Sequence, residues 1–195
     1  MELPSCLDCK YDEQGHPCRK ADGTFDFTKV AAGVVRYGRT FSADGDDNHD
    51  PAGRDAHAWA SDCAYEVEQD YPHLLLPLIV AAMDASETPG DAAYIAAGLL
   101  ENAVTKHGPF LIDNIEALAS KSGKFRYFLS AIWGERRTDP DVWARICKAV
   151  GSVGIMDTDG RGPASGGTAA PLNEAEAVTL LKTERVSDAA LKLKL

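Results

Sequence analysis

The sequence lacks the motifs by which many enzymes are recognised. Its 195 residues contain no nucleophile elbow, no phosphate-binding P-loop, no H-E-x-x-H helix and no kinase-type motif set. Glu101 and His107 are six positions apart, so a helix places them on different faces. We therefore assign no catalytic residue. An enzyme whose site is assembled from His57, His73, Glu101 or His107 is the weakest of the hypotheses that stay open.

The sequence also lacks a long apolar run. The most apolar stretch, residues 71–83, is about half of the roughly 20 residues that a membrane-spanning helix needs. The first residues are acidic and contain cysteine, without the apolar segment of a secretory signal. We therefore expect a cytoplasmic protein with no membrane span and with reduced cysteines.

Basic residues are few relative to acidic ones. The chain has 20 Lys and Arg against 30 Asp and Glu, a net charge of −10. Residues 1–70 hold 15 of the acids and 7 of the bases, a net charge of −8, and the remainder is nearly neutral. Such a balance repels the nucleic-acid backbone, so we expect no nucleic-acid partner. It suits a basic protein partner, or serves solubility alone.

Apolar residues recur with helical spacing through the middle of the chain. The segments 95–104, 111–118 and 125–133 each place their apolar side chains on one face, opposite polar side chains. Thr88-Pro89 and Asp139-Pro140 are typical of helix starts, and His107-Gly108-Pro109 indicates a joint between two helices. The pattern predicts an all-α fold: a small helical bundle, or a solenoid-like stack of antiparallel helix pairs.

Four regions follow from the composition. Residues 1–53 are predicted to form an acidic, irregular, cysteine-containing arm, with a short helix over 27–37 or, as the alternative, a strand over 34–37. Residues 54–150 form the helical core domain, and residues 151–172 form a flexible linker rich in Gly and Pro. A C-terminal helix over 173–195 is expected to dock on the core, and partner binding and fraying are the alternatives.

A candidate metal site lies in the N-terminal arm. Cys6, Cys9, His16 and Cys18 offer three thiolates and one imidazole within about a dozen residues, a ligand set typical of structural zinc. The usual second C-x-x-C pair is missing. The alternative is a mobile arm that carries reduced, unliganded cysteines.

An acidic segment follows, with carboxylates at Asp44, Asp46, Asp47 and Asp50. It does not match a calcium-binding EF-hand loop, because neither register places Gly at the sixth position. We interpret these aspartates as an exposed surface that contacts a basic partner.

The core resembles a small uncharacterised bacterial domain family over roughly residues 72–149. The resemblance rests on Ala97-Gly-Leu-Leu-Glu101, His107-Gly108, Ile115-Glu116, Phe125-Arg126 and Trp133, which follow the family signature A-G-x-L-E … H-G … I-E … F-R … W. It implies an all-helical fold and a bacterial origin, and it implies no activity, cofactor or catalytic residue.

Two functional hypotheses rank above the enzyme hypothesis. The first is a non-enzymatic protein–protein interaction module, of the immunity or antitoxin type, that neutralises a basic, toxin-like partner. The second is a zinc-stabilised adaptor or regulator that uses the N-terminal cysteines and histidine as ligands.

Overall fold

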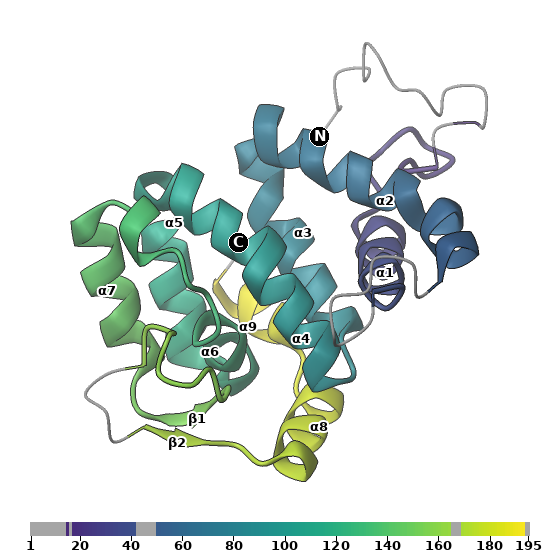
Figure 1. Ribbon diagram of the computed structural model, residues 1–195. Helices are drawn as coiled ribbons and strands as arrows, with labels where there is room; N and C mark the ends of the chain where they lie inside the picture. Colours follow the sequence, from purple (N-terminus) through teal and green to yellow (C-terminus); the bar gives the residue numbers. More distant parts are fainter. Residues whose placement is uncertain (1–14, 16, 42–49, 165–168, 194–195) are drawn as a thin grey trace.

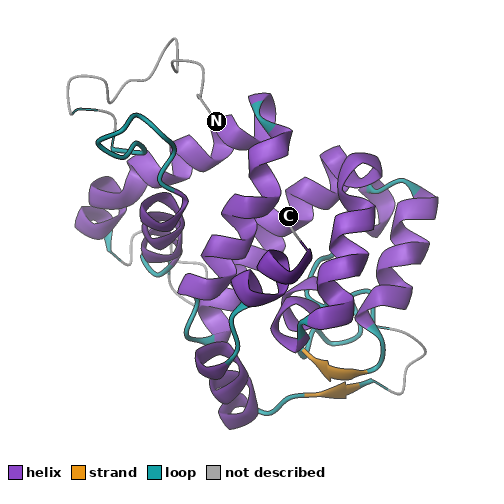
Figure 2. Ribbon diagram, turned by 180° about the vertical axis from the view of Figure 1, so that it is seen from behind, coloured by secondary structure: helices purple, strands orange, loops and turns teal. Residues whose placement is uncertain are grey.

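The computed structural model describes residues 15, 17–41, 50–164 and 169–193, and it shows the predicted all-α fold (Figures 1 and 2). The N-terminal helices are α1 (Phe27–Gly38), α2 (Pro51–Asp70) and α3 (Pro72–Ala85). The middle holds α4 (Pro89–Ile95), the π-helical segment η2 (Ala96–Leu100), α5 (Glu101–Lys121), α6 (Gly123–Leu129), the short 3₁₀ turn η3 (Glu135–Arg137) and α7 (Pro140–Val150). Strands β1 (Val153–Ile155) and β2 (Ala170–Pro171) and helices α8 (Glu174–Thr183) and α9 (Val186–Leu193) follow. None of the described helices has the length and apolar character needed to span a membrane.

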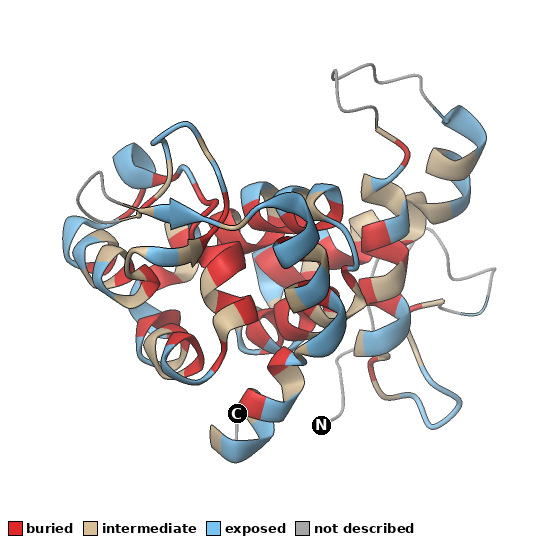
Figure 3. Ribbon diagram, turned by 90° about the horizontal axis from the view of Figure 1, so that it is seen from below, coloured by how far each residue is buried: buried red, intermediate tan, exposed pale blue. Residues whose placement is uncertain are grey.

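Helix α3 lies at the centre of the molecule. It contacts α1, α2, α5 and α9, and Leu75, Leu78, Ile79 and Met83 are fully buried. In Figure 3 the buried residues gather where these helices meet, and the exposed residues lie on their outer faces. The most apolar stretch of the sequence, residues 71–83, is thus part of the helix around which the others pack.

The predicted helix starts at Thr88 and Asp139 are confirmed. The Thr88 side chain accepts from the backbone N–H of Asp91, and the Asp91 carboxylate accepts in return from the N–H of Thr88, which is a complete capping box. Asp139 accepts from the N–H groups of Asp141 and Val142 at the start of α7. Both caps satisfy amides that have no partner within the helix.

The predicted joint at His107-Gly108-Pro109 is wrong, because α5 continues through it. Gly108 does not adopt a positive φ. The absence of a side chain at Gly108 leaves room for α7, because a Cβ there would come within 2.8 Å of Val142 Cγ1. The glycine therefore permits a close helix–helix contact, and Pro109 is accommodated inside the helix.

The predicted stripe over 125–133 is only partly correct. Helix α6 ends at Leu129, and Trp133 lies in the following turn with half of its surface exposed. The backbone N–H of Trp133 donates to the buried carboxylate of Glu101 at 2.7 Å. This hydrogen bond holds the turn against α5 instead of extending the helix.

The flanking regions also take part in the fold. Residues 27–38 form a helix, so the strand alternative is wrong, and Val30 and Ala31 reach the core. The region predicted as a linker contains the short parallel pair of β1 and β2. The C-terminal segment docks as predicted, but as two helices, through Leu181 of α8 and Val186 of α9. The domain boundaries themselves stay predictions.

Candidate functional site

A groove of about 480 Å³ opens between α1, α3, α5 and α9, and we call it the α3 groove. Its walls are mainly apolar, with Phe27 from α1, Leu111 and Leu118 from α5 and Leu191 from α9. Its volume and apolar lining fall within the range of ligand-binding clefts in proteins.

One face of α3 forms the floor of the groove. The lining positions His73, Leu76, Val80 and Asp84 recur every three or four residues, which places them in one row along the helix. A row from 73 to 84 is roughly 16 Å long, given a rise of about 1.5 Å per residue. The floor therefore has the length of about three helical turns.

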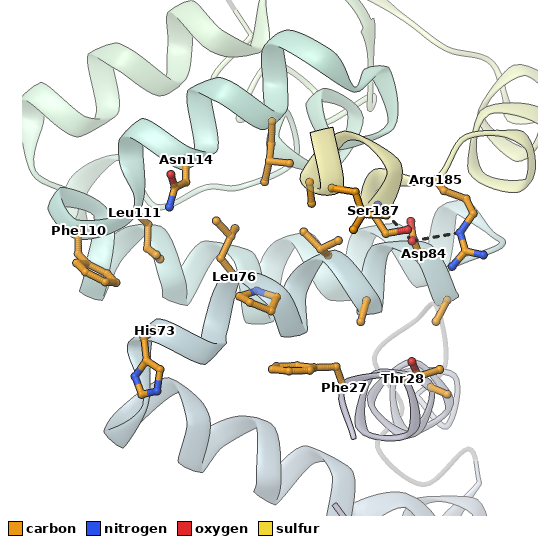
Figure 4. Close-up of a pocket in the computed structure, with 18 residues that line it drawn as sticks. Phe27, Thr28, His73, Leu76, Asp84, Phe110, Leu111, Asn114, Arg185 and Ser187 are labelled. Carbon is orange, nitrogen blue, oxygen red and sulfur yellow. Dashed lines mark hydrogen bonds and ion pairs between the residues drawn. The ribbon is translucent and has the colours of Figure 1, made fainter. Parts of the chain in front are cut away.

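Two large apolar side chains stand on the rim of the groove with most of their surface in solvent. Phe110 on α5 is 65% exposed, and Leu191 on α9 is 76% exposed. Figure 4 shows Phe110 near His73 at one end of the groove, with Arg185 and Asp84 at the other. Isolated exposed apolar residues are common, whereas these two lie together at one apolar groove.

The polar end of the groove holds α9 in place. The Asp84 carboxylate of α3 accepts from the backbone N–H groups of Val186 (2.7 Å) and Ser187 (3.3 Å) and from Arg185 Nε (3.4 Å). The side chain of Asp84 is only 8% exposed. Asp84 thus caps the start of α9 from another helix, where a negative charge is favoured.

A second set of buried polar contacts fixes the link between α8 and α9. The Glu184 carboxylate accepts from Ser122 Oγ at 2.6 Å and from the backbone N–H of Lys124 at 3.1 Å. The Lys124 ammonium is buried and donates to the carbonyl of Leu181 at 2.6 Å. Burial lowers the pKa of Lys124 below its ordinary value, although the charges of Asp84 and Glu184 oppose this.

A separate polar cluster joins α2 to α5 next to η2. The buried Glu68 carboxylate accepts from Asn102 Nδ2 at 2.9 Å, from Gln69 Nε2 at 2.9 Å and from Lys106 Nζ. His107 Nε2 lies 2.7 Å from the carbonyl oxygen of Glu68. Three donors already serve this carboxylate, so the cluster fastens two helices together rather than offering Glu68 to a ligand.

The residues of the enzyme hypothesis do not share one site. His73 lines the α3 groove, whereas His57 lines a different hollow between α1 and α2. Glu101 is held by Trp133 and Arg137, and His107 lies against Glu68. Because these groups belong to separate surroundings, their arrangement provides no common acid–base centre.

Most of the predicted metal and partner residues lie outside the described residues: Cys6, Cys9, His16, Asp44, Asp46 and Asp47. Cys18 is described and buried, with its carbonyl oxygen 2.9 Å from the N–H of Asp26. Asp50 caps α2 through a hydrogen bond from the N–H of Gly53 at 2.9 Å. Within the described residues no group of three or more His, Cys, Asp or Glu side chains could hold a metal ion. Because Cys6, Cys9 and His16 lie outside those residues, the zinc prediction stays untested.

The α3 groove was not predicted from the sequence, because its lining comes from helices that are distant from one another in the chain. Residues 71–83 are apolar on nearly every side, which is typical of a segment at the centre of a helical bundle. The flanking helices cover only part of α3, so His73 and Pro77 line an open surface. The walls come from α1, α5 and α9, which are distant from α3 in the sequence.

The comparisons with known proteins give one match. Residues 47–153 match a family of unknown function (DUF6869). This segment contains α2 to α7, and therefore the floor of the groove and its α5 wall, whereas the α1 and α9 walls lie outside it. No curated protein and no solved structure matches the chain.

Proposed function

The chain belongs to this family of unknown function, and we propose that it is a non-enzymatic binding protein whose α3 groove receives an apolar segment of a protein partner. The observation that carries the proposal is the exposure of Phe110 (65%) and Leu191 (76%) on the rim of an apolar groove. Burial of such side chains contributes about 25 cal/mol per Å² of apolar surface, which drives association.

The form of the groove favours a helix as the bound segment. Its floor is a single helical row of roughly three turns, bordered by α1 on one side and by α5 and α9 on the other. An amphipathic helix with apolar residues at positions i, i+3 or i+4 and i+7 matches a groove of this length. The partner then contributes its apolar face, and its polar face stays in solvent.

The charge of the chain supports a basic partner. Among the described residues that line the groove, the acidic and basic side chains are Asp84 and Arg185, which pair with each other. The excess of acid lies instead in residues 1–70, and the described part of this region contributes Phe27, Thr28 and Ala32 to the groove lining. In the proposal the groove supplies affinity, and the acidic segment that contains Asp44, Asp46 and Asp47 accelerates association with a basic, toxin-like partner in the bacterial cytoplasm.

The test is binding to the products of neighbouring genes, each purified and titrated by calorimetry. We expect one of them to bind, and Phe110→Ala combined with Leu191→Ala to weaken that complex by at least tenfold, as expected when hot-spot residues are truncated. Tyr65→Ala is the matched control, because Tyr65 is 63% exposed but lies on α2, outside the groove. A complex that the double substitution leaves intact, or the absence of binding by every neighbour, contradicts the proposal.

A further inference from the structure

The α9 wall of the groove differs from the other walls in how it is held. Helices α8 and α9 have 10 and 8 residues, shorter than the roughly 12–15 residues that an isolated helix needs to be even marginally stable. The buried apolar side chains of the pair are few: Ala177, Leu181, Val186 and Ala189. These two helices therefore depend on docking to remain folded, and undocking amounts to unfolding them.

One of the two sets of polar contacts that dock the pair lies at the groove. Asp84 caps α9 and lines the groove, and Arg185 and Ser187 line it from the other side. Glu184, bound to Ser122 and to the backbone of Lys124, fixes the turn between α8 and α9. A molecule in the groove can contact α9 only while α9 is docked, and these polar contacts hold it docked.

We propose that α8 and α9 form a detachable wall of the α3 groove, fastened through Asp84 and Glu184, so that docking of this wall and occupation of the groove stabilise each other. The proposal rests on the proposed function and adds a regulation of the same site. Linkage requires the effect to be reciprocal: a ligand that binds only the docked form shifts the docking equilibrium by a factor of 1 + [L]/Kd.

The family match is consistent with a wall of this kind. The matched segment, 47–153, ends before β2, α8 and α9, whereas the floor and the α5 wall lie inside it. The part of the groove that can detach is thus carried by the C-terminal extension of this chain, and it contributes Leu191 to the rim.

Hydrogen exchange of the full-length protein tests the coupling, with the apolar dye 1-anilinonaphthalene-8-sulfonate as the probe. At a dye concentration ten times its Kd, we expect amide exchange in residues 174–193 to slow by about tenfold. Exchange in α7, which does not line the groove, is the internal control and should change less than twofold. Equal slowing of both segments would indicate stabilisation of the whole molecule and would overturn the proposal.

Asp84→Asn examines the fastening directly. Asn keeps one acceptor oxygen but loses the negative charge and the second oxygen, which accepts from Ser187 N–H and Arg185 Nε. We therefore expect exchange in 186–193 to accelerate by about fivefold without the dye, and the dye to slow it again. Asp113→Asn is the control, because Asp113 is an exposed carboxylate on α5 that pairs with Arg145 away from the groove. An Asp84→Asn protein that exchanges at the wild-type rate contradicts the fastening role of Asp84.

Phe110→Ala separates the two proposals. If the Phe110→Ala protein binds the dye as tightly as the wild type, the dye does not occupy the groove beside Phe110. That result contradicts the groove as an apolar binding site, and with it the proposed function. Dye binding that depends on Phe110 but leaves exchange in 174–193 unchanged contradicts only the detachable wall.

Discussion

A glycine substitution tests the packing that the structure assigns to α5. Gly→Ala within a helix ordinarily stabilises a protein by about 0.5–1 kcal/mol. At Gly108 the added Cβ would lie 2.8 Å from Val142 Cγ1 and 3.5 Å from Val142 Cγ2, and Val142 is only 4% exposed. Because carbon atoms favour separations of about 3.5–4.0 Å, α5 and α7 must move apart.

The expected magnitude follows from a comparison with Gly98, which lies in η2. A Cβ at Gly98 meets no heavy atom within 4 Å, so Gly98→Ala should gain the ordinary helical preference of about 0.5–1 kcal/mol. Gly108→Ala gains the same preference but adds an overpacking cost of about 1–3 kcal/mol. The two variants should therefore differ by about 2 kcal/mol in the free energy of unfolding, with Gly108→Ala the less stable.

Urea unfolding followed by far-ultraviolet circular dichroism provides the measurement, with the urea dependence of the free energy checked to be equal in the two variants. A second substitution, Val142→Ala, removes both methyl groups that a Cβ at Gly108 would meet. The double-mutant cycle should show a favourable coupling of about 1–2 kcal/mol. Equal stabilities of Gly98→Ala and Gly108→Ala, or a coupling below about 0.3 kcal/mol, would refute the close contact between α5 and α7.

Three further predictions concern buried carboxylates and the metal site. Burial alone would raise the pKa of Asp91, but hydrogen bonds from Arg39 and from the backbone N–H of Glu87 outweigh it and hold the pKa below its ordinary value. A lowered folded-state pKa stabilises the protein above about pH 4. Asp91→Asn should therefore lower the free energy of unfolding by about 2 kcal/mol, measured with urea at pH 7. A decrease that stays constant down to pH 3 would count against this role of Asp91. Glu101→Gln should cost about 2 kcal/mol because it weakens the buried acceptor of the Trp133 N–H, and an unchanged unfolding midpoint would rule out that role. Elemental analysis of the purified protein should find about one zinc per chain if the predicted N-terminal site forms, and less than about a tenth of an equivalent would dispose of it.

The fold class was predictable because helical periodicity and caps are local signals. Thr88 and Asp139 mark true helix starts, since a capping side chain needs only residues two or three positions away. Gly108 and Pro109 misled the prediction because their surroundings are not local: the space beside Gly108 is taken by α7, more than thirty positions on. Glycine is typical both of a helix end and of a close helix crossing, so the residue alone does not distinguish the two.

The candidate site was not predictable for the same reason. The groove exists because α1 and α9 border a face of α3 without covering it, and no pattern within residues 71–83 records how far its neighbours reach. Asp84 was an unremarkable acid in the sequence, and its role as the cap of α9 depends on a contact between positions 84 and 186. Lys124 is likewise buried through a contact that is distant in the sequence, with the carbonyl of Leu181.

The most direct test of the binding account is a hydrogen-exchange footprint of the purified chain with and without its bound partner. The account predicts that the partner protects residues 73–85 of α3 together with 186–193 of α9 and the part of α5 around Phe110. Protection confined to other surfaces, such as α7 or the exposed side of α2 that carries Tyr65, would contradict the assignment of the α3 groove as the binding site.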